Sequence, residues 1–297
     1  MGMDACTLCP RMCGVNRAAG EKGYCGMAAT IRAARAALHM WEEPCISGTQ
    51  GSGAVFFSGC SLRCIFCQNF EIAEANCAKE ISGERLSEIF LELQEQGAAN
   101  INLVTAAHYV PAVIESLKKA KAQGMDLPVI YNSSGHERVE TVQMLEEVVD
   151  VWLPDFKYMD SKLAFAYSRA KDYPEVTRAA IREMMKAAGT CAYDEDGYIQ
   201  KGVIVRHLIL PGHTKNSIAV LDELYGTYGD DLTISLMNQY TPLPQVRNIP
   251  DLNRRVTKRE YEKVLDYALD LGITQGFFQE GGTAKESFIP LFDYEGL

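Results

Sequence analysis

Short apolar runs alternate with segments of helical periodicity from about residue 51 onward. The apolar runs predict β-strands at residues 54–59, 101–105, 128–132, 149–155, 203–210, 232–237 and 276–279. Between them, apolar residues spaced i, i+3, i+4, i+7 predict amphipathic helices, and Thr257 with Glu260 predicts a capping box before the last helix. Repeated strand–helix alternation predicts parallel β/α units. The candidates are a full or partial TIM-like (β/α) barrel and an open doubly wound sheet.

Polar residues follow almost every apolar run. They include Thr105, Asn132, Asp155, Asn238 and Gln279. In a β/α barrel the carboxyl ends of the strands converge on one site, so polar groups from several strands would surround one ligand. This pattern favours the barrel over the open sheet.

Residues 1–50 differ from the rest because they are rich in Cys, Arg and Ala and lack a clear strand–helix alternation. We therefore expect a small Cys-rich metal-binding module at 1–50 and a β/α barrel at 51–297. Within the first part, Glu42 and Glu43 are adjacent. Such a pair usually forms a solvated turn, and the alternative is that both face the mouth of the barrel.

Composition narrows the class of protein. The 297 residues are 47% hydrophobic and 23% charged, which is typical of a globular protein with one large domain, or one large and one small. The net charge of −10 argues against a nucleic-acid partner. No apolar run is long enough to span a membrane, and the first residues do not resemble a secretory signal. We therefore expect a cytoplasmic protein with no membrane partner.

Ten Cys in such a chain indicate metal ligation in a reducing compartment. Cys60, Cys64 and Cys67 form a C-x3-C-x2-C array directly after the first predicted barrel strand. A closed zinc site needs four protein ligands, so zinc would require a further, distant residue. A [4Fe–4S] cluster held by three Cys leaves one iron open to an exogenous ligand.

A second group of cysteines lies near the N-terminus. Cys6, Cys9, Cys13 and Cys25 provide four thiolates within twenty residues. Four thiolates suffice for a tetrahedral zinc site or for a second iron–sulfur cluster, and the spacing does not choose between them. The remaining Cys45, Cys77 and Cys191 are expected to be ordinary thiols.

The C-x3-C-x2-C array, with Phe66 directly before its third Cys, resembles the signature of the radical S-adenosylmethionine (SAM) enzymes. The wider sequence resembles pyruvate formate-lyase-activating enzymes, in particular homologues with a Cys-rich N-terminus. The resemblance implies a [4Fe–4S] cluster on the array, SAM on the open iron, and one-electron cleavage to a 5′-deoxyadenosyl radical that abstracts hydrogen from a substrate. It also implies an electron donor such as flavodoxin or ferredoxin.

The resemblance leaves the substrate open. It suggests a glycyl-radical enzyme, which would make this protein an activase, while a small molecule or a peptide is the alternative. A non-enzymatic iron–sulfur electron carrier is a further alternative from another class. A carrier needs neither an open iron nor a SAM pocket, so the three-Cys array argues against it.

The resemblance also implies roles for individual residues. Asp155 and Lys157 match a D-x-K pair whose carboxylate faces the SAM amino group and whose ammonium faces the SAM carboxylate. Phe66 would lie near the adenine. Val205, His207 and Ile209 alternate onto one face of a strand and are expected to line the adenine pocket.

Four further positions concern the rest of SAM. Asn238 and Gln239 stand where activating enzymes bear a ribose-contacting His, and Ser133 and Ser134 are candidate ribose or carboxylate contacts. The Gly-Gly-Glu that activating enzymes carry after the second strand is absent here. Thr105 and His108 occupy that region. We expect SAM recognition to be rearranged there, with Thr105 as a cofactor contact and His108 as a structural or substrate-side group.

Overall fold

The computed structural model describes residues 2–279 and 290–297. These residues build a ten-stranded sheet in the order β10-β9-β8-β6-β5-β4-β2-β1-β3, with β7 paired to β8. The strands that run parallel to one another are β2 (Ser52–Phe57), β4 (Ile101–Val104), β5 (Val129–Ser133), β6 (Val151–Pro154), β8 (Ile199–Leu208), β9 (Thr233–Met237) and β10 (Gly276–Phe278).

Every strand predicted from the apolar runs is confirmed, to within a few residues at each end. The largest difference is at the run 203–210, where β8 begins earlier, at Ile199. The extra residues form a hairpin with β7 (Ala192–Tyr193), which pairs antiparallel with the start of β8. Several parallel strands are buried along their whole length, because both faces of the sheet are covered.

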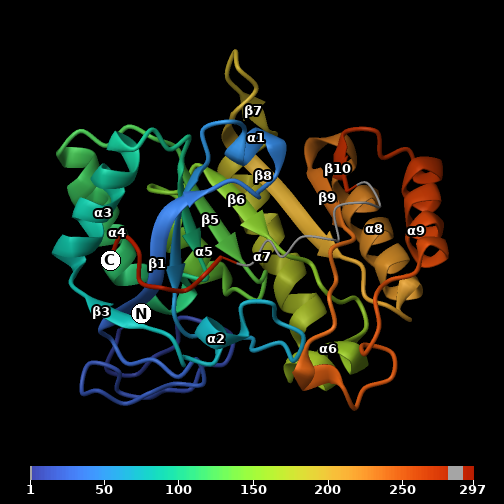
Figure 1. The fold of residues 1–297 in the computed structure, drawn as a ribbon, viewed down its shortest axis with the longest axis horizontal. Helices are drawn as coiled ribbons and strands as arrows, with labels where there is room; N and C mark the ends of the chain where they lie inside the picture. The colour runs from blue at the N-terminus through green and yellow to red at the C-terminus, as the bar shows by residue number, and fades with distance from the viewer. Residues whose placement is uncertain (1, 280–289) are drawn as a thin grey trace.

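Helices cover the outer face of the sheet (Figure 1). They are α3 (Gly83–Glu95), α4 (Val110–Ala122), α5 (Val139–Leu145), α6 (Ser161–Ser168), α7 (Tyr173–Ala188), α8 (Thr214–Tyr228) and α9 (Lys258–Leu271). Their apolar residues join the outward side chains of the strands, such as Trp152 and Val205, in the largest core cluster. The inward side chains of the strands are therefore left to line the interior of the barrel.

The barrel is partial. Among the described residues, the sheet runs from β10 at one edge to β3 (Lys79–Ile81) at the other, and no pairing joins these edges. The prediction of a full or partial TIM-like barrel is therefore confirmed in its partial form. The short elements are α2 (Phe70–Ala73), η1 (Ala107–Tyr109), η2 (Gly229–Asp231) and η3 (Pro244–Val246).

Residues 31–50 belong to the barrel sheet, although no strand was predicted before residue 51. They contain β1 (Ile31–His39), which pairs antiparallel with β2, and α1 (Pro44–Ser47). A register irregularity between Ala33 and Arg35 breaks the strict alternation that marks a strand in a sequence. The irregular Cys-rich part is therefore shorter than expected, and it ends near residue 30.

Helix α1 packs inside the barrel. Cys45 and Ile46 form a small core cluster with inward side chains of β5, β6 and β8. These contacts involve residues near the starts of the strands, so α1 closes the end of the barrel opposite the cysteine array. Within the described part of the chain, no helix combines the length and apolar character that crossing a membrane requires.

The predicted capping box at α9 is confirmed. Thr257 Oγ1 accepts a hydrogen bond from the backbone N–H of Glu260 at 3.2 Å, and a Glu260 oxygen accepts from the Thr257 N–H at 2.9 Å. Replacing Thr257→Ala should lower the free energy of unfolding by about 1 kcal/mol, measured by urea denaturation. Thr257→Ser keeps the hydroxyl and serves as the control. An equal loss in both variants would show that the cap is not the cause.

Candidate functional site

The cysteine array lies in the loop between β2 and α2, at the carboxyl end of the parallel strands. Cys60, Cys64 and Cys67 all line one cavity. Burial raises the pKa of Cys64, and the nearby Lys157 ammonium lowers it. The Ser168 hydroxyl donates to Cys64 Sγ at 3.0 Å. One thiol of the array thus has both a hydrogen-bond donor and a positive charge beside it.

The cavity occupies the inside of the barrel and measures about 820 Å³. This volume falls within the range of small-molecule and cofactor sites. Inward side chains of the strands form its wall, and α1 with its preceding loop forms its floor. Seven of the residues expected to bind a cofactor line it, namely Phe66, Thr105, Ser133, Ser134, Asp155, Lys157 and Gln239.

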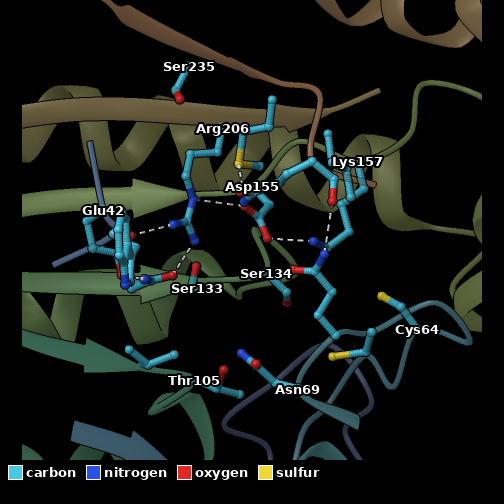
Figure 2. Close-up of a pocket in the computed structure, with 18 of the residues that line it drawn as sticks. Glu42, Cys64, Asn69, Thr105, Ser133, Ser134, Asp155, Lys157, Arg206 and Ser235 are labelled. Atoms are coloured by element: carbon cyan, nitrogen blue, oxygen red, sulfur yellow. Dashed lines mark hydrogen bonds and ion pairs between the residues drawn. The ribbon is translucent and has the colours of Figure 1, made fainter. Parts of the chain in front are cut away.

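A row of charged side chains crosses this cavity (Figure 2). Lys157 Nζ lies 2.5 Å from Asp155 Oδ2, and Arg206 Nε donates to Asp155 Oδ1 at 3.2 Å. Arg206 Nη1 donates to Glu42 Oε2 at 3.0 Å, and Nη2 donates to Asn132 Oδ1 at 2.5 Å. The charges therefore alternate in sign from the floor of the barrel to the cysteine array.

The pairing keeps these groups ionised. Burial alone would raise the pKa of Asp155, but Lys157 and Arg206 together hold it below its usual value. Burial alone would lower the pKa of Lys157 and of Arg206, but the adjacent carboxylates raise both. Each charge in the row therefore depends on its neighbours to remain charged out of water.

The expectation that Glu42 and Glu43 form a solvated turn is wrong. Both line the cavity, and Glu43 is 8% exposed. Glu42 Oε1 accepts from Asn102 Nδ2 at 3.1 Å and from Asn132 Nδ2 at 3.3 Å. Burial raises the pKa of Glu43. The turn is drawn into the barrel because α1 packs against the inward face of the sheet.

Arg206 was not among the residues predicted for the site. It lies on β8 between Val205 and His207, so the alternation of a strand puts it on the face opposite theirs. Val205 and His207 do share one face, as expected, but this face packs against the helices and not against the cavity. The inward positions of β8 are Arg206 and Leu208. Arg206 is the one Asp, Glu, Lys or Arg residue in the apolar run 203–210, and this was the signal that could have identified it.

His207 itself lies between the sheet and α8. Its Nδ1 is 2.6 Å from the Phe156 carbonyl oxygen, and its Nε2 is 2.9 Å from Ser217 Oγ. Both ring nitrogens are engaged on the side of the sheet away from the cavity. The position therefore corresponds to packing and not to the adenine pocket expected from the sequence.

Asn238 also lies outside the set of cavity-lining residues, whereas Gln239 is within it. The backbone N–H of Asn238 donates to Gln279 Oε1 at 2.9 Å, and Gln239 Oε1 accepts from Gln279 Nε2 at 3.3 Å. Gln279 thus holds the end of β9 and joins the cavity wall. It belongs to the polar strand ends noted in the sequence.

Thr105 and His108 separate in the structure. Thr105 directly follows β4 in a left-handed backbone conformation, with φ of 63°, and lines the cavity. His108 is buried beside the cysteine loop, with Nε2 2.7 Å from the Ser58 carbonyl oxygen. Burial lowers the pKa of His108 to about 3, so the ring is neutral at physiological pH. Its position supports the structural interpretation over the substrate-side one.

The N-terminal cysteines converge although their loops contain no regular element. An ideal Cβ added at Gly23 would lie 2.9 Å from Cys13 Sγ and 3.7 Å from Cys25 Sγ, so a side chain there would meet both sulfurs. Burial raises the pKa of Cys9 and of Cys25. Nearby thiolates raise them further, Cys25 and Cys13 in the case of Cys9, and Cys6 and Cys13 in the case of Cys25. Cys6, Cys9 and Cys25 are buried, and Cys13 is exposed.

Among residues 2–279 and 290–297, no three His, Cys, Asp or Glu side chains are arranged to hold one metal ion. This holds for the array at Cys60, Cys64 and Cys67 as well as for the N-terminal group. In a [4Fe–4S] cluster each Cys binds a different iron, so its sulfurs need not gather around one point.

Comparisons with known proteins were made for sequence and for fold. A scan against protein-family models finds no match. The chain is 29% identical over 277 residues to uncharacterized protein MJ0674 of Methanocaldococcus jannaschii, covering 90% of this chain and 76% of that protein. That name gives no activity, so the sequence relative does not by itself define a function.

Solved structures define the fold. HydG, a maturase of the [FeFe]-hydrogenase, matches with a TM-score of 0.54 at 14% identity, over 76% of this chain and 51% of HydG. Streptococcus suis SuiB bound to S-adenosylmethionine matches at 0.47 and 15%, over 76% and 50%. A domain of pyruvate-formate lyase-activating enzyme from Bacteroides vulgatus matches at 0.42 and 17%, over 58% and 92%.

The chain has the fold of the radical SAM enzymes, and the match to HydG carries this assignment. The part of this chain that matches spans about half the length of HydG and of SuiB. At such identities the likeness concerns the fold, so the chemistry has to be argued from the residues.

The position of His207 generates a test. Burial lowers its pKa from the ordinary 6.5 to about 4. A group whose pKa is lower in the folded state contributes stability above pH 6.5 that is lost as the pH falls toward 4. His207→Gln should reduce this loss, by up to roughly 1.4 kcal/mol per pH unit, in urea denaturation across that range. SAM affinity should stay unchanged. A large fall in SAM affinity would show that His207 contributes to the binding site.

Proposed function

We propose that this protein is a radical SAM enzyme in which Cys60, Cys64 and Cys67 hold a [4Fe–4S] cluster. The observation that carries the proposal is the position of these thiols in one loop at an 820 Å³ cavity whose other wall bears paired charges. The donor set fits the group, because three thiolates leave one iron for an exogenous ligand.

Asp155 and Lys157 are proposed to bind the amino-acid end of SAM. That end carries an ammonium and a carboxylate, and the Asp155–Lys157 pair presents the complementary charges. The pair stands beside Cys64, whose pKa responds to the charge of Lys157. A bound zwitterion would replace each partner of the pair with a group of the same sign, so neither buried charge would lose its compensation.

The remaining wall suits the nucleoside end of SAM. Phe66 is 5% exposed and packs edge-on against Tyr158 and Tyr167, which fixes its ring at the cavity. Thr105, Ser133 and Gln239 offer hydroxyl and amide groups to a ribose. These residues orient the ligand and exclude water from it.

When bound, the cluster supplies one electron to the sulfonium of SAM, and the resulting 5′-deoxyadenosyl radical removes a hydrogen atom from the substrate. The barrel encloses the site and keeps solvent away from the radical, which prevents side reactions. A donor of the flavodoxin or ferredoxin class would provide the electron. We further propose that the protein acts in the cytoplasm.

For the substrate, we favour a polar small molecule or a peptide segment over a glycyl-radical enzyme. The supporting observation is the floor of the cavity. Glu43 is buried there, and Arg206 and Glu42 form an ion pair whose side chains are 15% and 8% exposed. Charged groups at this depth match a charged or polar ligand inside the barrel. Activation of a glycyl-radical enzyme would require a protein segment to reach the same space, and it is supported by the sequence resemblance alone.

Cys64→Ala should abolish formation of 5′-deoxyadenosine from SAM by the dithionite-reduced protein, because a cluster with one ligand lost is not retained. Product is measured by chromatography, and iron per chain is measured in parallel. Cys191→Ala is the matched control, since Cys191 packs near α1 outside the array. Full activity in Cys64→Ala would refute the proposed cluster site.

Lys157→Ala should weaken SAM binding by roughly 1.5–3 kcal/mol, the value of a hydrogen bond to a charged group. Binding is measured by equilibrium dialysis with the iron-loaded protein. Lys162→Ala, which removes an exposed lysine five residues away, should leave the affinity unchanged. Equal affinity in the wild type and in Lys157→Ala would exclude Lys157 from SAM recognition.

A further inference from the structure

The two cysteine loops interlock. Arg11, between Cys9 and Cys13, donates from Nε to the Ser61 carbonyl oxygen at 2.8 Å and from Nη2 to the Ser168 carbonyl oxygen at 2.8 Å. Ser61 follows Cys60 directly. A side chain of the N-terminal loop thus fixes the backbone of the array.

Further contacts join the two loops. The Tyr24 ring lies 4.1 Å from the Arg11 guanidinium carbon and 5.6 Å from that of Arg63. Tyr24 precedes Cys25, and Arg63 precedes Cys64. An ideal Cβ at Gly59 would lie 2.8 Å from the Cys25 carbonyl oxygen, so the backbone of Cys25 touches the residue before Cys60.

A buried cation completes the junction. Arg17 is 1% exposed and donates to the carbonyl oxygens of Met27 at 3.2 Å and Ala28 at 2.6 Å. Its Nη1 lies 3.8 Å from Cys6 Sγ and also donates to the His108 carbonyl oxygen. The His108 ring in turn contacts Ser58. A guanidinium charge therefore sits between the N-terminal thiols and the start of the array.

The position of the four N-terminal thiols favours a cluster over zinc. Zn²⁺ exchanges no electrons, whereas an iron–sulfur cluster does. The thiols are gathered at the junction, since a Cβ at Gly23 would meet the sulfurs of Cys13 and Cys25. Their loop touches the loop of the array, which is where a centre that exchanges electrons with the array would have to lie.

The N-terminal group also has one open side. Cys13 is exposed while the other three thiols are buried, and the neighbouring Met12 is 56% exposed. The buried side, at Cys25, faces the array. A redox centre here would meet solvent on one side and the barrel on the other.

We propose that Cys6, Cys9, Cys13 and Cys25 hold a second [4Fe–4S] cluster that relays electrons to the cluster in the barrel. This inference rests on the proposed function, which supplies the acceptor. A low-potential protein donor of the ferredoxin or flavodoxin class loses one electron to the N-terminal cluster at its Cys13 side. That cluster passes the same electron across the Cys25–Gly59 contact, and SAM is the final acceptor as its sulfonium C–S bond breaks.

The experiment uses the full-length chain, purified without oxygen and reconstituted with iron and sulfide. Iron, sulfide and zinc are counted per chain for the wild type, for Cys13→Ala/Cys25→Ala, and for Cys60→Ala/Cys64→Ala/Cys67→Ala. We expect about eight irons in the wild type and about four in each variant, with no stoichiometric zinc. The EPR signal of the fully reduced wild type should be broader than the sum of the two variants, since adjacent paramagnetic clusters couple.

The two proposals fail in different samples. One zinc with about four irons in the wild type would overturn the second cluster, as would loss of all iron in the triple variant. A triple variant that keeps about eight irons would overturn the proposed function instead. If the double variant does not fold, the triple variant alone decides, because about four irons can remain there only at the N-terminal group. An EPR spectrum equal to the sum of the parts would overturn the relay.

Discussion

The burial of charge inside the barrel is the constraint on which the site depends. Arg206 contacts Glu42 in the loop before α1, Asn132 on β5 and Asp155 at the end of β6. A guanidinium in this position is tolerated only because its donors meet acceptors from three directions. The same contacts connect the floor of the barrel to its wall. The shape of the cavity and the pairing of its charges therefore depend on each other.

These contacts also explain the positions of the irregular segments around the cavity. The turn at Glu42 and Glu43 enters the barrel because it carries the carboxylate that Arg206 requires, while α1 behind it supplies the apolar packing. At the other end, Gly135 lets the loop after β5 pass the Asp155 carbonyl, where an added Cβ would lie only 2.1 Å from that oxygen. The cysteine loops pack at the carboxyl ends of the strands, which these contacts hold in place.

Much of the fold could be predicted from the sequence, because buried parallel strands are continuous apolar runs and the helices between them have a clear helical period. The cysteine array could also be recognised from the sequence, since its three residues lie close together along the chain. What failed depended on distant partners. Strand β1 was hidden by its irregular register, the burial of Glu42 depends on Arg206 far along the chain, and the choice between Arg206 and His207 depends on which face of β8 meets the helices.

The alternating row of charges has a consequence for how this sequence can change over time. Loss of one partner from a buried ion pair costs about 3–5 kcal/mol, a large share of the stability of a typical domain. Substitutions at Glu42, Asp155 and Arg206 are therefore not independent, and their effects will not add. Evolutionary substitution at these positions is therefore expected to change two or more of the paired residues together, so that each buried charge keeps a partner.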